Sequence, residues 1–408
     1  MDINPSGLMT HLALAGASHF SRVTGQITET PLVTSPSQIP VEMQCSPEAL
    51  GALEFPGDLF LPGGPRNYVG AVICLRLTLY FKDAHTAATR EHLCLCFDAF
   101  SELAGDALSW LWREKPKRGM PKQRVKNSKP LRDMIETMSE DDHLSFCYTS
   151  GTRAEDAGAW KFLIFGAQAW KARIGRDMSV LELSVPISCL PTQREDFIEL
   201  AAKCARWLSA EHGHAGYAVN LSEVRRERNE PVEALLASRY PGLDAGCAPL
   251  LANKPQLAHL KIKTVSWLTL MDHARLEAAG GLDRLRSALP ERHFTLHDYG
   301  NGVMVQAGPR PLACTDAADP RPPAYVLLDH LLRGIRPASV GNLHFNRKSA
   351  EPRLVGQLAE QWVCRFEVDA SEISTHEERL AQQHALTDGD IRDETPFANQ
   401  LIAQAKPQ

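Results

Sequence analysis

The chain has 408 residues, of which 44% are hydrophobic and 23% are charged, and its net charge is −5. This is the composition of a globular protein with room for a large core, built as one domain or as two or three. The small net charge does not indicate nucleic acid or an anionic membrane as the main partner, and no apolar run reaches the roughly 18 residues that span a bilayer.

The first 50 residues are rich in Thr, Ser, Pro and Gly and show weak hydrophobic periodicity. We therefore expect a weakly structured extension there. Between residues 71 and 81 apolar side chains alternate along the chain, which predicts a long strand. The helix expected next has apolar residues three or four apart on one face; these are Leu93, Phe97, Phe100, Ala104, Leu108 and Leu111.

Residues 113–132 contain nine basic residues and a single acid, Glu114. Pro116, Gly119 and Pro121 exclude a regular helix in this segment. Such a loop can bind phosphates by charge, but it lacks aromatic residues on which bases could stack. It reads either as a solvated insertion or as a nucleic-acid contact.

Further strands are predicted at residues 144–149, 160–165 and 179–187. Thr192 and Glu195 have the spacing of a capping box, in which each side chain satisfies an N–H group at a helix start. The helix that they open is expected to end at Gly213. A short strand at residues 217–221 follows it.

The second half repeats this kind of order. A strand is predicted at residues 260–270, and a helix at 274–288 that Gly280 and Gly281 interrupt. Residues 293–299 and 302–307 are expected to form a hairpin, because Gly300, Asn301 and Gly302 tolerate positive φ at its turn. A last helix begins at Pro322-Pro323 and runs to Gly334.

Hairpins together with covering helices predict an α+β fold with a largely antiparallel sheet. The alternation along the strands favours a sheet with one face exposed to solvent. Both halves place a strand before a helix and hairpin-like strands after it. A duplicated strand–helix–hairpin unit stays a hypothesis, because the halves do not align residue by residue.

The sequence shows no catalytic signature. A hydrolase elbow, a phosphate-binding loop, a dinucleotide fingerprint and a zinc-protease motif are all missing. Glu211, His212 and His214 resemble a metal cluster, but no third and fourth ligand is evident, and we expect them at a polar helix end. Turn formation accounts for Asp298 and its neighbours, and Trp267 is expected in the core.

The ten cysteines are scattered without C-x-x-C spacing, which predicts reduced thiols rather than a disulfide framework. Because the catalytic, metal and phosphate-binding motifs are also missing, we expect no cofactor, no metal and no catalytic residues.

Several strings of the chain occur together in one collinear order. Residues 264–324 include TVSWLTLM, HFTLHDYGNGVMVQAGPRP and DPRPPA, and residues 71–113 and 180–190 contain a strand-and-helix segment and a second strand. Residues 213–222 read GHAGYAVNLS. On these strings the chain resembles the type VI secretion immunity family, formerly a domain of unknown function, over residues 51–340.

The resemblance implies an immunity protein without enzymatic activity. Such a protein binds a cognate effector toxin, here a nuclease of the virus-type replication-repair class, and neutralises it by occluding its active site. It implies a cytoplasmic location, where a nuclease acts, and the absence of a secretory signal agrees with this. Residues 1–50 and 341–408 lie outside the resemblance, as an N-terminal and an acidic C-terminal extension.

Residues 367–394 contain nine acids and only two arginines. An acidic stretch complements the basic groove with which a nuclease holds nucleic acid, so Glu377, Glu378, Asp388 and Asp390 are the predicted partner-binding residues. A solvated tail is the competing interpretation.

Two other classes of function stay open. One is a nucleic-acid-associated protein that acts through residues 113–132, although nucleic acid is not the expected partner. The other is an enzyme whose site is assembled from distant polar residues. A cluster of His, Asp and Cys in one deep pocket would favour the enzyme.

Overall fold

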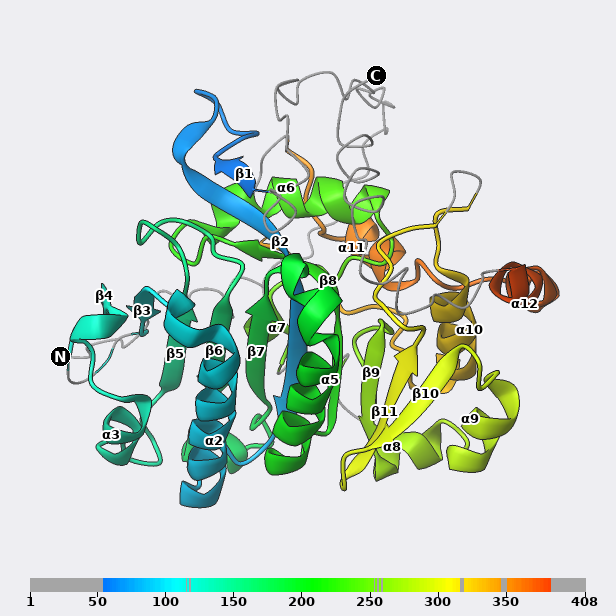
Figure 1. The fold of residues 1–408 in the computed structure, drawn as a ribbon, viewed down its shortest axis with the longest axis horizontal. Helices are drawn as coiled ribbons and strands as arrows, with labels where there is room; N and C mark the ends of the chain where they lie inside the picture. Colours follow the sequence, from blue (N-terminus) through cyan, green and yellow to red (C-terminus); the bar gives the residue numbers. More distant parts are fainter. Residues whose placement is uncertain are drawn as a thin grey trace, which may run out of the picture.

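The computed structural model describes residues 54–382, except for residues 115, 117–118, 253, 255–256, 258–259, 316–318 and 346–350. Their centre is one 11-stranded sheet in which neighbouring strands pair antiparallel throughout. The strand order is β10-β11-β9-β8-β2-β7-β6-β5-β3-β4, with β1 on β2. The predicted α+β fold with a largely antiparallel sheet is confirmed (Figure 1).

The strands of the first half are β1 (Glu54–Gly57), β2 (Arg66–Phe81), β3 (Trp110–Trp112), β4 (Lys122–Arg124), β5 (Leu144–Thr149), β6 (Lys161–Gly166) and β7 (Ser179–Val185). Those that follow are β8 (His212–Leu221), β9 (Leu268–Asp272), β10 (Phe294–Asp298) and β11 (Gly302–Ala307). The sheet is thus built around β2, the strand that the alternation at residues 71–81 predicted.

The longer helices are α2 (Ala87–Ala104), α5 (Leu190–Trp207), α6 (Arg226–Arg239), α10 (Pro323–Leu331) and α12 (Ile373–Gln382). The shorter ones are α3 (Leu131–Glu136), α4 (Ala169–Ala172), α7 (Ala248–Leu251), α8 (His273–Ala278), α9 (Leu282–Ala288) and α11 (Gln357–Val363). Helices α2 and α5 lie side by side across the front of the sheet (Figure 1). Within the described residues, no helix is long and apolar enough to cross a membrane.

Two helices end earlier than predicted. Helix α2 stops at Ala104 because Gly105 adopts φ 53°, outside the right-handed helical region; Leu111, assigned to its apolar face, is a buried residue of β3 instead. Helix α5 begins at Leu190 with Cys189 at its N-cap and ends at Trp207. Gln193 interrupts it with non-helical angles, φ −126° and ψ 21°, so the longer part of the helix begins one residue after the predicted cap Thr192. The stop predicted at Gly213 is wrong, since Gly213 lies in β8.

Most of the second half is as predicted. The helix at 274–288 is divided into α8 and α9 by Gly280 and Gly281, both at positive φ, and residues 294–307 form the β10–β11 hairpin. The strand predicted at residues 260–270 is shorter, because regular pairing begins only at Leu268 and Leu260 has a φ of 66°. The two halves have one feature of topology in common. In each, the last strand pairs with the first: β7 pairs with β2, and β11 pairs with β9.

The prediction of a sheet with one exposed face is wrong at its centre, because β2 from Ala71 onward, β7 and β8 are buried on both faces. Leu75, Leu77 and Leu79 belong to the main core, which also contains α2 and α5 residues such as Phe100 and Cys204. The alternate side chains of β2 include the polar residues Arg76 and Thr78, and other parts of the chain cover them: α6 contacts β2 and β8, and α7 contacts β7. Polar residues on these central strands are therefore buried instead of exposed to solvent.

Candidate partner interface

Helix α12 holds the two predicted partner-binding residues that the structure describes. His376 and Leu380, four residues apart, are buried, whereas Glu377 and Glu378 between them are exposed. Arg379 fixes the helix to the loop that precedes α10, through Asp319 Oδ2 at 2.7 Å and Thr315 Oγ1 at 3.0 Å. The two carboxylates are therefore presented from an anchored helix.

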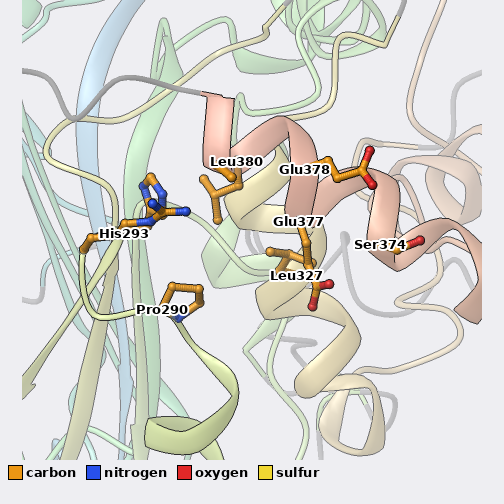
Figure 2. A pocket seen from close by; sticks show the side chains of 9 residues that line it. Pro290, His293, Leu327, Ser374, Glu377, Glu378 and Leu380 are labelled. Atoms are coloured by element: carbon orange, nitrogen blue, oxygen red, sulfur yellow. The ribbon is translucent and has the colours of Figure 1, made fainter.

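A groove of about 370 Å³ lies between α12, α10 and the turn that precedes β10, and Figure 2 shows the side chains that line it. Glu377 and Glu378 lie along it, Leu327 and Leu380 give it apolar surface, and its lining is completed by Pro290, Arg292, His293, Ser374 and Ala381. A groove with apolar surface and carboxylates at its rim suits a partner segment that carries basic and apolar side chains. Asp388 and Asp390 lie outside the described residues.

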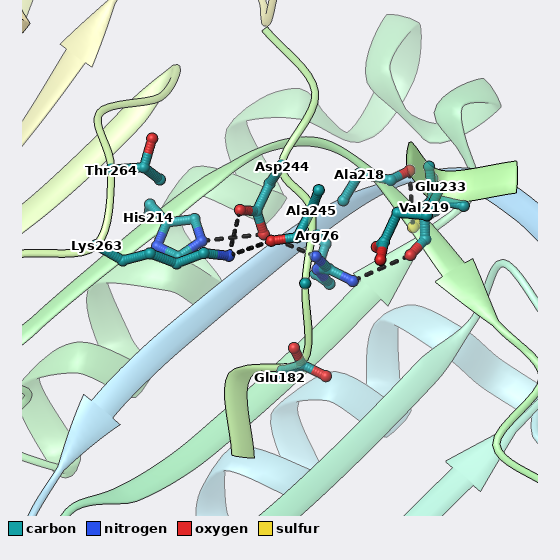
Figure 3. A network of polar contacts seen from close by, with 12 residues as sticks. Arg76, Glu182, His214, Ala218, Val219, Glu233, Asp244, Ala245, Lys263 and Thr264 are labelled. Carbon is teal, nitrogen blue, oxygen red and sulfur yellow. Dashed lines mark hydrogen bonds and ion pairs between the residues drawn. The ribbon is translucent and has the colours of Figure 1, made fainter. Parts of the chain in front are cut away.

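A second polar assembly lies inside the molecule, behind β2 (Figure 3). The Asp244 carboxylate accepts hydrogen bonds from Arg76 Nη2 at 2.7 Å and Lys263 Nζ at 2.5 Å, and His214 Nε2 lies 3.1 Å from it. Burial alone would raise the pKa of Asp244, but Lys263, His214 and Arg76 outweigh it and hold the pKa well below its ordinary value. Asp244 is thus an ionised carboxylate between buried cations.

This buried layer extends along neighbouring strands. Lys161 on β6 pairs with Glu182 on β7 at 3.2 Å and with Glu223. Burial alone would raise the pKa of Glu182, but the charges of Lys161 and Arg76 outweigh burial and lower the pKa to about 2. Under α6, Glu233 binds His344 at 2.7 Å. Each of these buried carboxylates has a hydrogen-bonding or oppositely charged side chain beside it, as burial requires.

The histidines predicted at a polar helix end lie elsewhere. His212 and His214 are on β8, 1% exposed, and His212 stacks on Tyr80 with ring centroids 4.3 Å apart. Burial lowers the pKa of both imidazoles. No group of three or more metal-ligating side chains that could hold an ion occurs in the described part of the chain. Because Asp244 and His214 are at most 4% exposed, a substrate has no access to them.

The remaining candidates have structural roles. Gly300 has a φ of 91° and its N–H donates to Asp298 Oδ1 at 2.6 Å, which confirms the turn. Trp267 is fully buried, as predicted. The described cysteines are free thiols. Cys94 and Cys96 are buried on α2, where burial raises the pKa of both thiols.

Comparison with known proteins identifies a family and places a similar solved structure beside this chain. The family described as "TsiV: Type VI immunity for VRR-NUC" matches residues 92–366. The solved structure described as "Pseudomonas aeruginosa T6SS protein PA0821" shares 50% sequence identity with a TM-score of 0.80, over 83% of this chain and 93% of that one. No curated protein matches the chain.

Proposed function

We propose that this chain, which belongs to the TsiV family of type VI immunity proteins for VRR-NUC, neutralises its effector by occluding the surface with which that nuclease holds nucleic acid. The observation behind the proposal is the family match over residues 92–366. An immunity protein acts by binding a toxin, so its functional site is a protein–protein interface. The resemblance stated from the sequence is confirmed by the family and by the type VI relative.

The groove beside α12 supports occlusion as the mechanism. A nuclease must hold a polyphosphate backbone and therefore presents cations along its groove. Glu377 and Glu378 oppose such a surface in charge, and Leu327 and Leu380 lie beside them. We place the effector contact here, on the residues that sequence composition selected. Phe366 and Leu380 belong to the main core, so this contact stands on the same folded body as the sheet.

A cytoplasmic location follows from the proposed target. Nucleic acid is the substrate of a nuclease, and in a bacterial cell it lies in the cytoplasm. The immunity protein must meet the toxin before substrate does, so we propose that it acts there. The division into residues 1–50, 51–340 and 341–408 stays a prediction alongside this one.

The purified chain is expected to form a stable complex with the VRR-NUC effector and to protect cells that express it. Because an immunity protein must outcompete substrate at low toxin concentration, we expect a Kd in the nanomolar range or below, about −12 kcal/mol or stronger. Titration calorimetry measures the affinity, and co-expression measures protection. The chain alone, incubated with DNA and divalent metal, serves as control and should leave the DNA intact.

Persistent toxicity on co-expression with the effector would contradict the proposal. So would metal-dependent DNA cleavage by the purified chain that a single substitution abolishes. The second result would support the alternative hypothesis that the chain is an enzyme.

Glu377→Gln together with Glu378→Gln is expected to slow association with the effector several-fold at low salt. Long-range attraction acts mainly on the encounter rate, and salt screens it beyond about 8 Å at physiological ionic strength. Stopped-flow kinetics at two salt concentrations measure the effect. Asp98→Asn with Glu102→Gln on α2 removes the same charge from another exposed surface. Equal slowing by both pairs would mean that net charge, not the groove, steers the encounter.

A further inference from the structure

At the opposite end of the sheet from α12, cationic side chains lie on aromatic rings. The Arg124 guanidinium lies 3.9 Å from the ring centroid of Trp110, and Lys122 Nζ lies 5.2 Å from that of Trp112. Lys171 Nζ lies 5.7 Å from the ring of Trp170 on α4. We call these six residues the Trp–cation face.

Strand register creates the first two contacts. Trp110 pairs with Arg124 and Trp112 with Lys122 across the β3–β4 ladder, so each cation stands directly opposite an indole. Residues two apart on a strand share a face, and Leu111 between them points the other way and is fully buried. The two indoles and their cations therefore form a small array on one side of the edge hairpin.

Helix α4 lies beside the connection between β3 and β4. Glu114 in that connection lies 3.4 Å from His143, and the charge of Lys171 on α4 acts on His143. Lys171 Nζ also lies 6.0 Å from the ring of Phe165, against whose edge His143 packs. Trp170 is 44% exposed. Phe165 and Trp112 pack in the same hydrophobic cluster, so Lys171 lies on the side of the sheet that carries Trp112.

The cations cover these rings only weakly. An exposed cation–π contact contributes about 0.5–1 kcal/mol, so the cation stays available to pair with a carboxylate of a partner while it lies on the ring. Trp110 and Trp112 are half-buried, which means that their ordering cost is largely met before binding. Trp and Arg are the residue types most enriched at the energetic centres of protein interfaces.

The positive charge of the Trp–cation face favours an acidic partner. Residues 113–132 contain nine basic residues and one acid, and Lys122, Lys126 and Lys129 are exposed. The Arg173 side chain beside Trp170 is 63% exposed. Such a surface complements an acidic one. A nucleic acid fits less well, because base stacking needs an open ring face and Arg124 already lies over Trp110.

We infer that the Trp–cation face docks an acidic surface of a protein partner. Resting on the proposed function, that partner is the effector, and the acidic surface belongs to a region outside its nucleic-acid groove. The strand order places β4 and β10 nine strand spacings apart, roughly 40 Å, which exceeds the span of one standard interface of about 800 Å² per partner. The face and the α12 groove therefore contact separate regions of the effector.

Lys122→Glu and Lys203→Glu form a matched pair for the test. Both lysines are exposed, with 41% and 50% of the side chain accessible, and each already lies near one glutamate. With the full chain and the purified effector, Lys122→Glu is expected to raise Kd at least tenfold. Lys203→Glu on α5 is expected to change Kd less than threefold.

Trp170→Ala tests the aromatic contribution separately. Its ring is exposed, so the melting temperature should stay within experimental error while the dissociation rate rises about tenfold. Equal effects of Lys122→Glu and Lys203→Glu, with an unchanged rate for Trp170→Ala, would overturn the inference and leave the proposed function standing. A wild-type chain that does not bind the effector would overturn both.

A fluorescent single-stranded oligonucleotide serves as the competing probe. We expect no binding at physiological salt. Binding that falls steeply with salt and is lost in Lys122→Glu would overturn the assignment to a protein partner.

Discussion

Replacing Asp244 by alanine is expected to lower the free energy of unfolding by about 3–5 kcal/mol, the usual cost of removing one partner from a buried ion pair. Two fully buried cations, Arg76 and Lys263, donate hydrogen bonds to this carboxylate, and His214 completes its surroundings. Without the carboxylate their charges stay in the interior without compensation. Denaturant unfolding followed by circular dichroism measures the change.

Asp244→Asn separates charge from shape, because it keeps the volume and replaces the carboxylate by a neutral amide with one acceptor oxygen and an NH2 donor. It should reproduce most of the loss. Asp98→Ala, on the exposed face of α2, removes the same kind of group from the surface and should change stability by less than about 0.5 kcal/mol. A loss below 1 kcal/mol for Asp244→Ala would mean that the cations re-pair elsewhere or reach water.

The polar layer also marks the limit of what sequence could predict about the fold. Alternation along β2 was visible, and it identified the core face through Leu75, Leu77 and Leu79 correctly. The other face, with Arg76 and Thr78, has the pattern of a solvated strand. Long-range packing by α6, α7 and the segments that carry Asp244 and Lys263 buries it, and the compensating Asp244 lies 168 residues from Arg76. No local pattern encodes such a pairing.

The candidate interfaces were also predictable from the sequence only in part. Composition selected Glu377 and Glu378, because an excess of acids is visible without a fold. The groove beside them was not predictable, since Pro290, Leu327 and Leu380 come from three separate segments. Trp110 was missed for a local reason: the predicted helix ran on past Gly105, which hid β3 and its register with Arg124.

Trp267→Ala is expected to cost about 3–5 kcal/mol and Leu77→Ala about 2–5 kcal/mol of stability. Trp267 is fully buried, stacks on Phe197 with centroids 6.3 Å apart, and donates from Nε1 to Gly308 O at 3.0 Å. Its truncation leaves a cavity and removes one of the two hydrogen bonds that Gly308 O accepts, the other coming from Gln306 Nε2. Leu77 is fully buried on the core face of β2, where truncation leaves only a cavity. Thermal unfolding of both variants measures the losses.

Trp170→Ala is the matched control for Trp267→Ala, because it removes the same side chain from an exposed position. The physical distinction is where the truncated atoms were: buried atoms lose their packing partners, whereas exposed atoms lose mainly contact with water. We therefore expect the melting temperature to fall for Trp267→Ala alone, with effector affinity kept by the fraction that stays folded. An unchanged melting temperature with lost effector binding would move Trp267 from the core to the interface and would contradict its full burial.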